Sequence, residues 1–313
     1  MANSTFGATV SLMHNNLACS PNGWVACLHN SVNLGGGKLM LHALTSGLTT
    51  NGPEINQATS LRYLELASGV VLCLTSTSGT QLYTEDASAL LFHAGVHDVS
   101  TSDTMKCHQA SCVVPSFQQI VVGTSKGALL LINAAGGQYA TLPEATPSTV
   151  AGEVADVCFS EVAQTVFSVH TNGELRPWTP SPEGGYTCMG SIPTMGQAPV
   201  RILPLGARLA VAFGPGTLCL YDALSRELQV EVTAHGRWIN GMVSREDLGQ
   251  VATVSEDTVL NVWQVEPSSG HVSLVTSTIP VDKLLTGVGY FGDTICVSAY
   301  DSDELYRTSL MPM

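Results

Sequence analysis

Short apolar runs of about six residues recur along this chain of 313 residues, and small or polar residues follow each run. Seven of the runs resemble one another, and their first residues lie 42 to 49 positions apart. They are rich in Val, Ile and Leu, which favours strands. The seven runs are WVACLH (from Trp24), VVLCLT (Val70), QIVVGT (Gln119), TVFSVH (Thr165), RLAVAF (Arg208), QVATVS (Gln250) and TICVSA (Thr294).

Three further strands are expected around each run. A second strand follows most of the runs and closes on a large side chain at the same period: Tyr83, Ile132, Trp178, Tyr221, Trp263 and Tyr306. Another candidate precedes the hairpin (61–66, 154–160, 200–206), and a fourth follows it (186–192, 228–234). Four short strands in a repeat of about 44 residues are typical of a β-propeller blade. We therefore predict an all-β, seven-bladed propeller with four antiparallel strands per blade, forming one domain over residues 1–313.

The weak in-out alternation of the strands agrees with this architecture, because each blade packs against a blade on either side. No helical periodicity is sustained. Pro177 cannot donate to a ladder, which predicts a bulge or a blade rim at that position. The last repeat offers three strands, whereas residues 5–14 (TFGATVSLMH) form a spare β-like run. We expect this run to supply the outer strand of the seventh blade and so to close the ring.

The sixth repeat carries four residues with a defined pattern: His235, Ser255, Asp257 and Trp263. They match the structural tetrad of the WD40-repeat β-propeller family, which the chain resembles most specifically from Arg208 to Leu310. Gln264 stands where the family has the Asp of its Trp-Asp pair. The resemblance implies that the four side chains form a hydrogen-bonded network that ties the blade together. Because buried polar groups are tolerated when they satisfy one another, we interpret Asp257 as a structural acid.

Composition limits the partners that we expect. The formal net charge is −13, with 12 basic and 25 acidic residues, so no basic footprint for nucleic acid or anionic lipid is present. No apolar run approaches 18 residues, and the first residues do not resemble a secretory signal. Nine Cys without such a signal favour reduced thiols in the cytoplasm. Charged residues make up 12% of the chain, which favours a surface that other proteins cover in a stable complex.

Three patterns suggest chemistry without meeting its requirements. Residues 123–127 read G-x-S-x-G, but a strand follows where a nucleophile elbow needs a helix. Residues 35–38 (GGGK) lack the other positions of a phosphate loop. One cluster has metal-capable side chains in spacings that match no zinc template: His93, His97, Asp98, Cys107, His108 and Cys112. We predict no catalytic residue, no metal and no cofactor.

The function predicted from these observations is a non-catalytic scaffold within a larger protein assembly. By analogy with other charge-poor propellers, we place it in the cytoplasm, in the cytoskeleton of a cilium or flagellum and its axoneme. The alternative is an adaptor that recognises a peptide in the central channel within a cytoplasmic signalling or trafficking complex. That alternative requires Arg or aromatic side chains gathered on one face, and the sequence does not show where they would gather.

Overall fold

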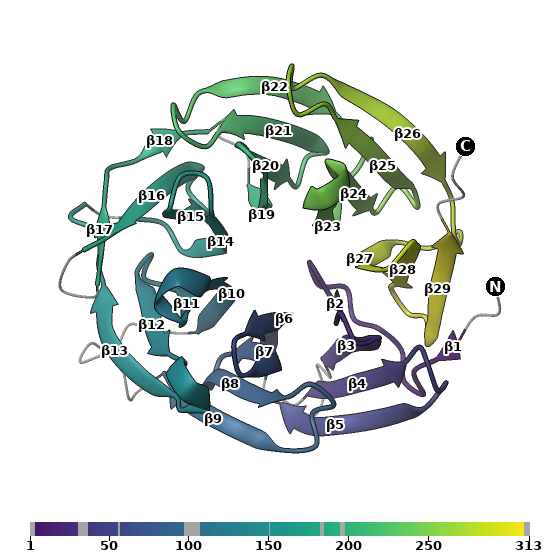
Figure 1. Ribbon diagram of the computed structural model, residues 1–313. Coiled ribbons are helices and arrows are strands. Elements are labelled where there is room, and N and C mark those ends of the chain that lie inside the picture. Colours follow the sequence, from purple (N-terminus) through teal and green to yellow (C-terminus); the bar gives the residue numbers. More distant parts are fainter. Residues whose placement is uncertain are drawn as a thin grey trace.

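The computed structural model describes residues 4–30, 37–55, 57–96, 107–149, 151–181, 185–194 and 198–309. Seven antiparallel sheets stand around a central axis, each with one strand at the centre and one at the periphery (Figure 1). The described helical turns are three 3₁₀ turns of three residues: Pro115–Phe117, Ala135–Gly137 and Glu246–Leu248. No helix in the described part of the chain is long and apolar enough to cross a membrane. The predicted seven-bladed propeller is therefore confirmed.

Each of the first six blades follows the chain order from the axis outward. Blade 1 contains β2 (Leu17–Cys19), β3 (Trp24–Asn30), β4 (Gly37–Ala43) and β5 (Thr49–Ile55), and blade 2 contains β6 (Ala58–Leu66), β7 (Gly69–Ser76), β8 (Gly79–Thr84) and β9 (Leu90–Gly95). Blade 3 contains β10 (His108–Val114), β11 (Gln119–Thr124), β12 (Leu129–Asn133) and β13 (Ala140–Ala145), and blade 4 contains β14 (Val154–Ser160), β15 (Thr165–His170), β16 (Glu174–Pro180) and β17 (Tyr186–Cys188), with β18 (Ile192–Pro193) beside β16. Blade 5 contains β19 (Pro199–Leu205), β20 (Arg208–Phe213), β21 (Thr217–Asp222) and β22 (Leu228–Thr233), and blade 6 contains β23 (Ile239–Arg245), β24 (Gln250–Ser255), β25 (Leu260–Val265) and β26 (Val272–Thr278).

The apolar core lies between neighbouring blades. The second strands β11, β15 and β20 are buried along their whole length, because both faces of each sheet are covered. One cluster joins Val121 and Leu131 of blade 3 to Val157, Val166 and Trp178 of blade 4. At roughly 25 cal/mol per Å² of apolar surface, this burial between blades is the main source of stability. No single blade could hide both of its faces alone.

The seventh blade is completed from both ends of the chain. Three strands come from the C-terminal part, β27 (Leu285–Phe291), β28 (Thr294–Ala299) and β29 (Glu304–Ser309). The outermost strand, β1 (Ser4–Thr5), pairs with β29 so that Ser4 faces Leu305. Closure of the ring by the N-terminal strand is thus confirmed, but this strand is shorter than the predicted run 5–14. Residues after Thr5 leave the edge, and Phe6 and Val10 are buried against blades 1 and 7.

Pro177 interrupts the outer edge of blade 4. β17 pairs with residues 178–180 of β16, and β18 pairs with Glu174 and Leu175, so the fourth strand is broken opposite Pro177. A proline has no N–H for the ladder, which accounts for the break at this position.

The innermost strands share one irregularity that bears on the channel. In blades 2 to 7, the first strand shifts register against the second near its start, as in a β-bulge. The residues that follow the shift are Ser60, Ser111, Asp156, Arg201, Gly241 and Gly287. A bulge bends the strand and redirects the side chains beside it. Two charged residues, Asp156 and Arg201, occupy this position on neighbouring blades.

Candidate functional site

The predicted tetrad of blade 6 forms a continuous hydrogen-bonded network, but one of its four residues differs from the prediction. His235 Nδ1 lies 3.1 Å from both carboxylate oxygens of Asp257. His235 Nε2 lies 2.8 Å from Thr253 Oγ1, and the same hydroxyl accepts a 3.1 Å bond from Trp263 Nε1. Burial lowers the pKa of His235, although Asp257 opposes the shift. The partners therefore assign a neutral imidazole that donates from Nδ1 and accepts at Nε2.

The structure places Thr253, rather than the predicted Ser255, at the hydroxyl position of the tetrad. Trp263 lies opposite Val251 across the ladder, so Thr253 is two residues along on the same face. At about 3.3 Å per residue this separation is about 7 Å, which an indole can span, whereas Ser255 lies about 13 Å along the strand. Ser255 instead accepts the Asp257 backbone N–H at 3.1 Å and holds the turn.

A second network of this kind, in blade 4, was missed by the sequence analysis. Trp178 Nε1 donates to Ser168 Oγ at 2.8 Å, and that hydroxyl lies 2.7 Å from His170 Nε2. His170 Nδ1 lies 2.8 Å from the Gly152 carbonyl, which replaces the carboxylate of blade 6. His170 stands two residues after the hydroxyl, the position that Ser255 has in blade 6. Burial lowers the pKa of His170 to about 4, so this imidazole is neutral too.

In the described part of the chain, no three of the metal-capable residues near blade 3 are brought together. His97 and Asp98 lie outside the described residues. His108 is buried, its Nδ1 is 2.8 Å from Thr80 Oγ1, and burial lowers its pKa to about 4. In the described ranges, no three His, Cys, Asp or Glu side chains gather as metal ligands would. Residues 123–127 span the end of β11 and the turn that leads to β12, with a bond from Gly127 N to the Thr124 carbonyl.

The central channel carries the charged groups of greatest interest. Arg62 of blade 2 reaches across it, donating to the carbonyls of Ser111 and of Val157 (2.9 Å), and it pairs with the Asp156 carboxylate. Asp156 also accepts the backbone N–H of Ile202 of blade 5 at 2.9 Å. Arg62 and Asp156 are 10% and 2% exposed at their side chains. A buried ion pair with additional hydrogen bonds ties blades 2, 3, 4 and 5 together.

Arg201 is the least satisfied charge in this group. Its Nε lies 3.7 Å from Asp156 Oδ2, and within the described chain its guanidinium donates no hydrogen bond. The side chain is 13% exposed. Burial lowers the pKa of Arg201 to about 9, and the nearby Arg62 lowers it as well. Two guanidinium groups thus share one buried carboxylate.

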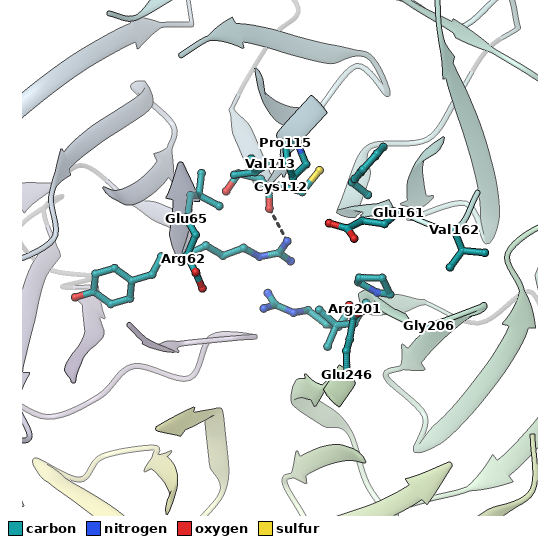
Figure 2. A pocket seen from close by; sticks show the side chains of 16 residues that line it. Arg62, Glu65, Cys112, Val113, Pro115, Glu161, Val162, Arg201, Gly206 and Glu246 are labelled. Carbon is teal, nitrogen blue, oxygen red and sulfur yellow. Dashed lines mark hydrogen bonds between the residues drawn. The ribbon is translucent and has the colours of Figure 1, made fainter. Parts of the chain in front are cut away.

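A polar cavity lies directly over these groups (Figure 2). Two adjoining cavities of about 570 and 580 Å³ share five lining residues: Arg62, Tyr63, Glu65, Arg201 and Glu246. Together they are lined by the first strands and following turns of all seven blades. We call this combined opening the channel mouth. Burial raises the pKa of Glu246, and the neighbouring Glu161 raises it further.

The other end of the channel is crossed by the chain itself. Asn15 Nδ2 donates to the Val200 carbonyl of blade 5 (3.2 Å), and Asn15 N donates to Asn240 of blade 6 (2.6 Å). Asn16 N donates to Thr286 of blade 7 at 3.3 Å. His14 stacks on Trp238 with 5.7 Å between ring centroids. The channel mouth, which lies on the side of the turns between the first and second strands, is therefore more open than the opposite end of the channel.

The sequence contains a signal for the charged residues of the channel. Arg62, Asp156 and Arg201 are charges inside the three apolar runs that were predicted as strands preceding the hairpin, 61–66, 154–160 and 200–206. An ionisable side chain in a strand enclosed by neighbours needs a partner or a function. Their mutual contacts were not predictable, because the three residues belong to different blades.

The ring of seven four-stranded blades, with an imidazole-hydroxyl-indole network in two of them, defines the chain as a WD-repeat β-propeller. A chain of the solved structure "Crystal Structure of Mitotic Checkpoint Complex" superposes on it with a TM-score of 0.78, covering 99% of this chain and 95% of that chain. The sequence identity is 12%, so this likeness shows the fold alone.

Sequence comparison then gives the family. The WDR54 family model matches residues 28–311, and the chain belongs to this family. WD repeat-containing protein 54 of Mus musculus is 26% identical over 270 residues, which cover 80% of this chain and 77% of the mouse protein. The Homo sapiens protein of the same name is 25% identical over 290 residues, covering 86% and 82% of the two chains. WD-repeat propellers are typically non-catalytic scaffolds for protein interactions.

Proposed function

We propose that the chain is a non-catalytic scaffold that holds partner proteins in a stable assembly. The observation that carries this proposal lies on the periphery, where outermost strands present large apolar side chains to solvent. Leu90 of β9, Leu228 of β22 and Leu274 of β26 are 53%, 42% and 50% exposed. A rigid ring that displays such side chains on several blades offers several separate contact surfaces.

The placement that we propose is cytoplasmic, in the cytoskeletal assemblies of a cilium or flagellum and its axoneme. Its support is the low charge of the chain, 12% Asp, Glu, Lys and Arg, which leaves uncharged surface for permanent contacts. Locating the endogenously tagged protein in ciliated cells tests the placement. Signal spread through the cytosol and absent from the axoneme would refute it.

Co-purification of the tagged protein at low and high salt tests the scaffold itself. Contacts made by Leu274 and similar side chains are apolar, so we expect the partners to stay bound at high salt. Leu274→Ser should release any partner that uses blade 6, whereas Ser277→Ala, an exposed change on the same strand, should not. Recovery as a free monomer under all conditions would contradict the proposal.

A second candidate function is an adaptor that recognises a peptide in the central channel. The channel mouth favours it, because three Arg and two Tyr side chains gather there from four blades: Arg62, Tyr63, Arg201, Arg245 and Tyr290. Arg and Tyr are enriched among the residues that dominate binding at protein interfaces. This is the gathering of Arg and aromatic groups that the sequence could not locate.

A further inference from the structure

We propose that the channel mouth binds a short segment of a partner protein. Arg201 binds one carboxylate of that segment, and the glutamates that line the mouth bind its basic side chains. The inference rests on the second candidate function and specifies its ligand. The carboxylate is that of an Asp or Glu side chain or that of a chain terminus, and peptide selection in two formats separates these two sources.

The charge count at the base of the mouth points to an anion. Arg62 and Arg201 bring two positive charges, and Asp156 brings one negative charge. Arg62 is satisfied by Asp156 and two carbonyls, whereas the Arg201 guanidinium has the 3.7 Å contact to Asp156 and no hydrogen bond within the described residues. A guanidinium is a planar fork of five donors that matches a carboxylate with two parallel bonds. An arriving carboxylate would complete this pair.

The geometry makes Arg201 reachable from the mouth. Its side chain lines both cavities, and Figure 2 shows the Arg201 and Arg62 guanidinium groups directed toward one another inside the opening. The volume of each cavity, about 570 to 580 Å³, accommodates a few side chains rather than a folded domain. A short extended segment or a loop tip is the form of ligand that fits.

The residues around Arg201 determine the rest of the ligand. Glu65, Glu161 and Glu246 surround the opening (Figure 2), and within the described residues no ion pair neutralises the three of them. Three carboxylates repel a dianion such as a phosphate group and attract Lys or Arg. A single carboxylate followed within a few residues by a basic side chain is complementary to both parts of the site. The chain as a whole, at −13, also favours a ligand with net positive charge.

Selection from a random peptide library on the purified full-length chain tests the inference. One format presents peptides with free carboxyl termini, and the other presents peptides with blocked ends. We expect enriched peptides that combine an acidic group with a neighbouring Lys or Arg. Enrichment in the free-acid format alone would assign the terminal carboxylate, and enrichment of Asp or Glu in both formats would assign a side chain.

Fluorescence anisotropy with an enriched peptide then measures the contribution of Arg201. Arg201→Met should lower the affinity for the peptide at least tenfold. Arg201→Lys should lower this affinity less, because the positive charge is kept. Replacing the acidic group of the peptide by its amide should lower the affinity for the unchanged chain as much as Arg201→Met does. Because this measurement uses the unchanged chain, it does not depend on how well the variant folds. Arg237→Met is the matched control, since this exposed residue precedes β23 at the other end of the channel.

Three outcomes would overturn the inference. They are equal binding by Arg201→Met and the unchanged chain, equal binding of the acid and amide peptides, or enriched peptides without an acidic group. In each of these cases a channel adaptor would survive with another ligand. Enrichment of no peptide at all would end both the inference and the second candidate function, and it would leave the scaffold proposal untouched.

Discussion

The tetrad of blade 6 allows a direct test of which hydroxyl holds the network. Thr253→Val keeps the shape of the side chain but removes the hydroxyl that joins His235 Nε2 to Trp263 Nε1. Two buried polar atoms then lose their partner, at about 1 to 3 kcal/mol each before relaxation. We expect the free energy of unfolding to fall by about 2 to 4 kcal/mol. Ser255→Ala removes one bond at the turn and should cost about 0.5 to 1.5 kcal/mol.

Thermal and urea unfolding of the purified chain measure these differences. For 313 residues, an unfolding entropy of about 2.1 cal/mol/K per residue converts 2 to 4 kcal/mol into a fall in Tm of about 3 to 6 °C. Thr253→Ser is the matched control, because it keeps the hydroxyl and removes one methyl group, worth about 1 kcal/mol. If Ser255→Ala destabilised the chain as much as Thr253→Val, the assignment of the tetrad hydroxyl to Thr253 would be refuted.

Two further predictions concern the ring closure and the response to pH. Phe6→Ala should lower the free energy of unfolding by about 3 to 5 kcal/mol in urea denaturation, because Phe6 is 1% exposed between blades 1 and 7. Leu12→Ala, at a position that is 48% exposed, should change it by less than about 0.5 kcal/mol, and equal effects would show that the N-terminal segment does not close the ring. The pKa of His170 falls to about 4 on folding, so its unfolded form binds a proton first as the pH drops. The stability that neutral His170 provides is present above about pH 6.5 and is lost toward pH 4, by up to about 1.4 kcal/mol per pH unit. His170→Asn should therefore be less stable at pH 7.5 but should lose less stability between pH 6.5 and 4 than the unchanged chain; parallel curves in urea titrations would contradict this.

The repeat architecture was predictable because each blade has a short apolar run that can be identified in the local sequence. The second strand of every blade coincides with one of the seven apolar runs to within one residue at either end, for example 165–170 as β15 and 208–213 as β20. Such runs report burial on both faces, which any neighbouring blade provides. The count of seven followed from their period. The fourth strands were less regular, as the break opposite Pro177 shows.

The functional residues were predictable only in part, because their partners are set by geometry between strands and between blades. The match to the family tetrad identified His235, Asp257 and Trp263, but Thr253 and Ser255 share one face of β24, and only the register of the strands distinguishes them. The network of blade 4 was not predicted, because its His170 lies in the second strand of the blade and not in the loop before the first strand. The contact between Arg62 and Asp156 joins residues 94 positions apart.

The pairing of Ser4 with Leu305 has a consequence for how the chain acquires its structure. This contact joins residues 301 positions apart, so it cannot form during synthesis until β29 has left the ribosome. Until then blade 7 lacks its outer strand, and β29 presents an unpaired edge that can recruit another nascent chain. We expect the yield of folded protein to depend on how quickly this last ladder forms, and chaperones that shield strand edges to matter most at that step.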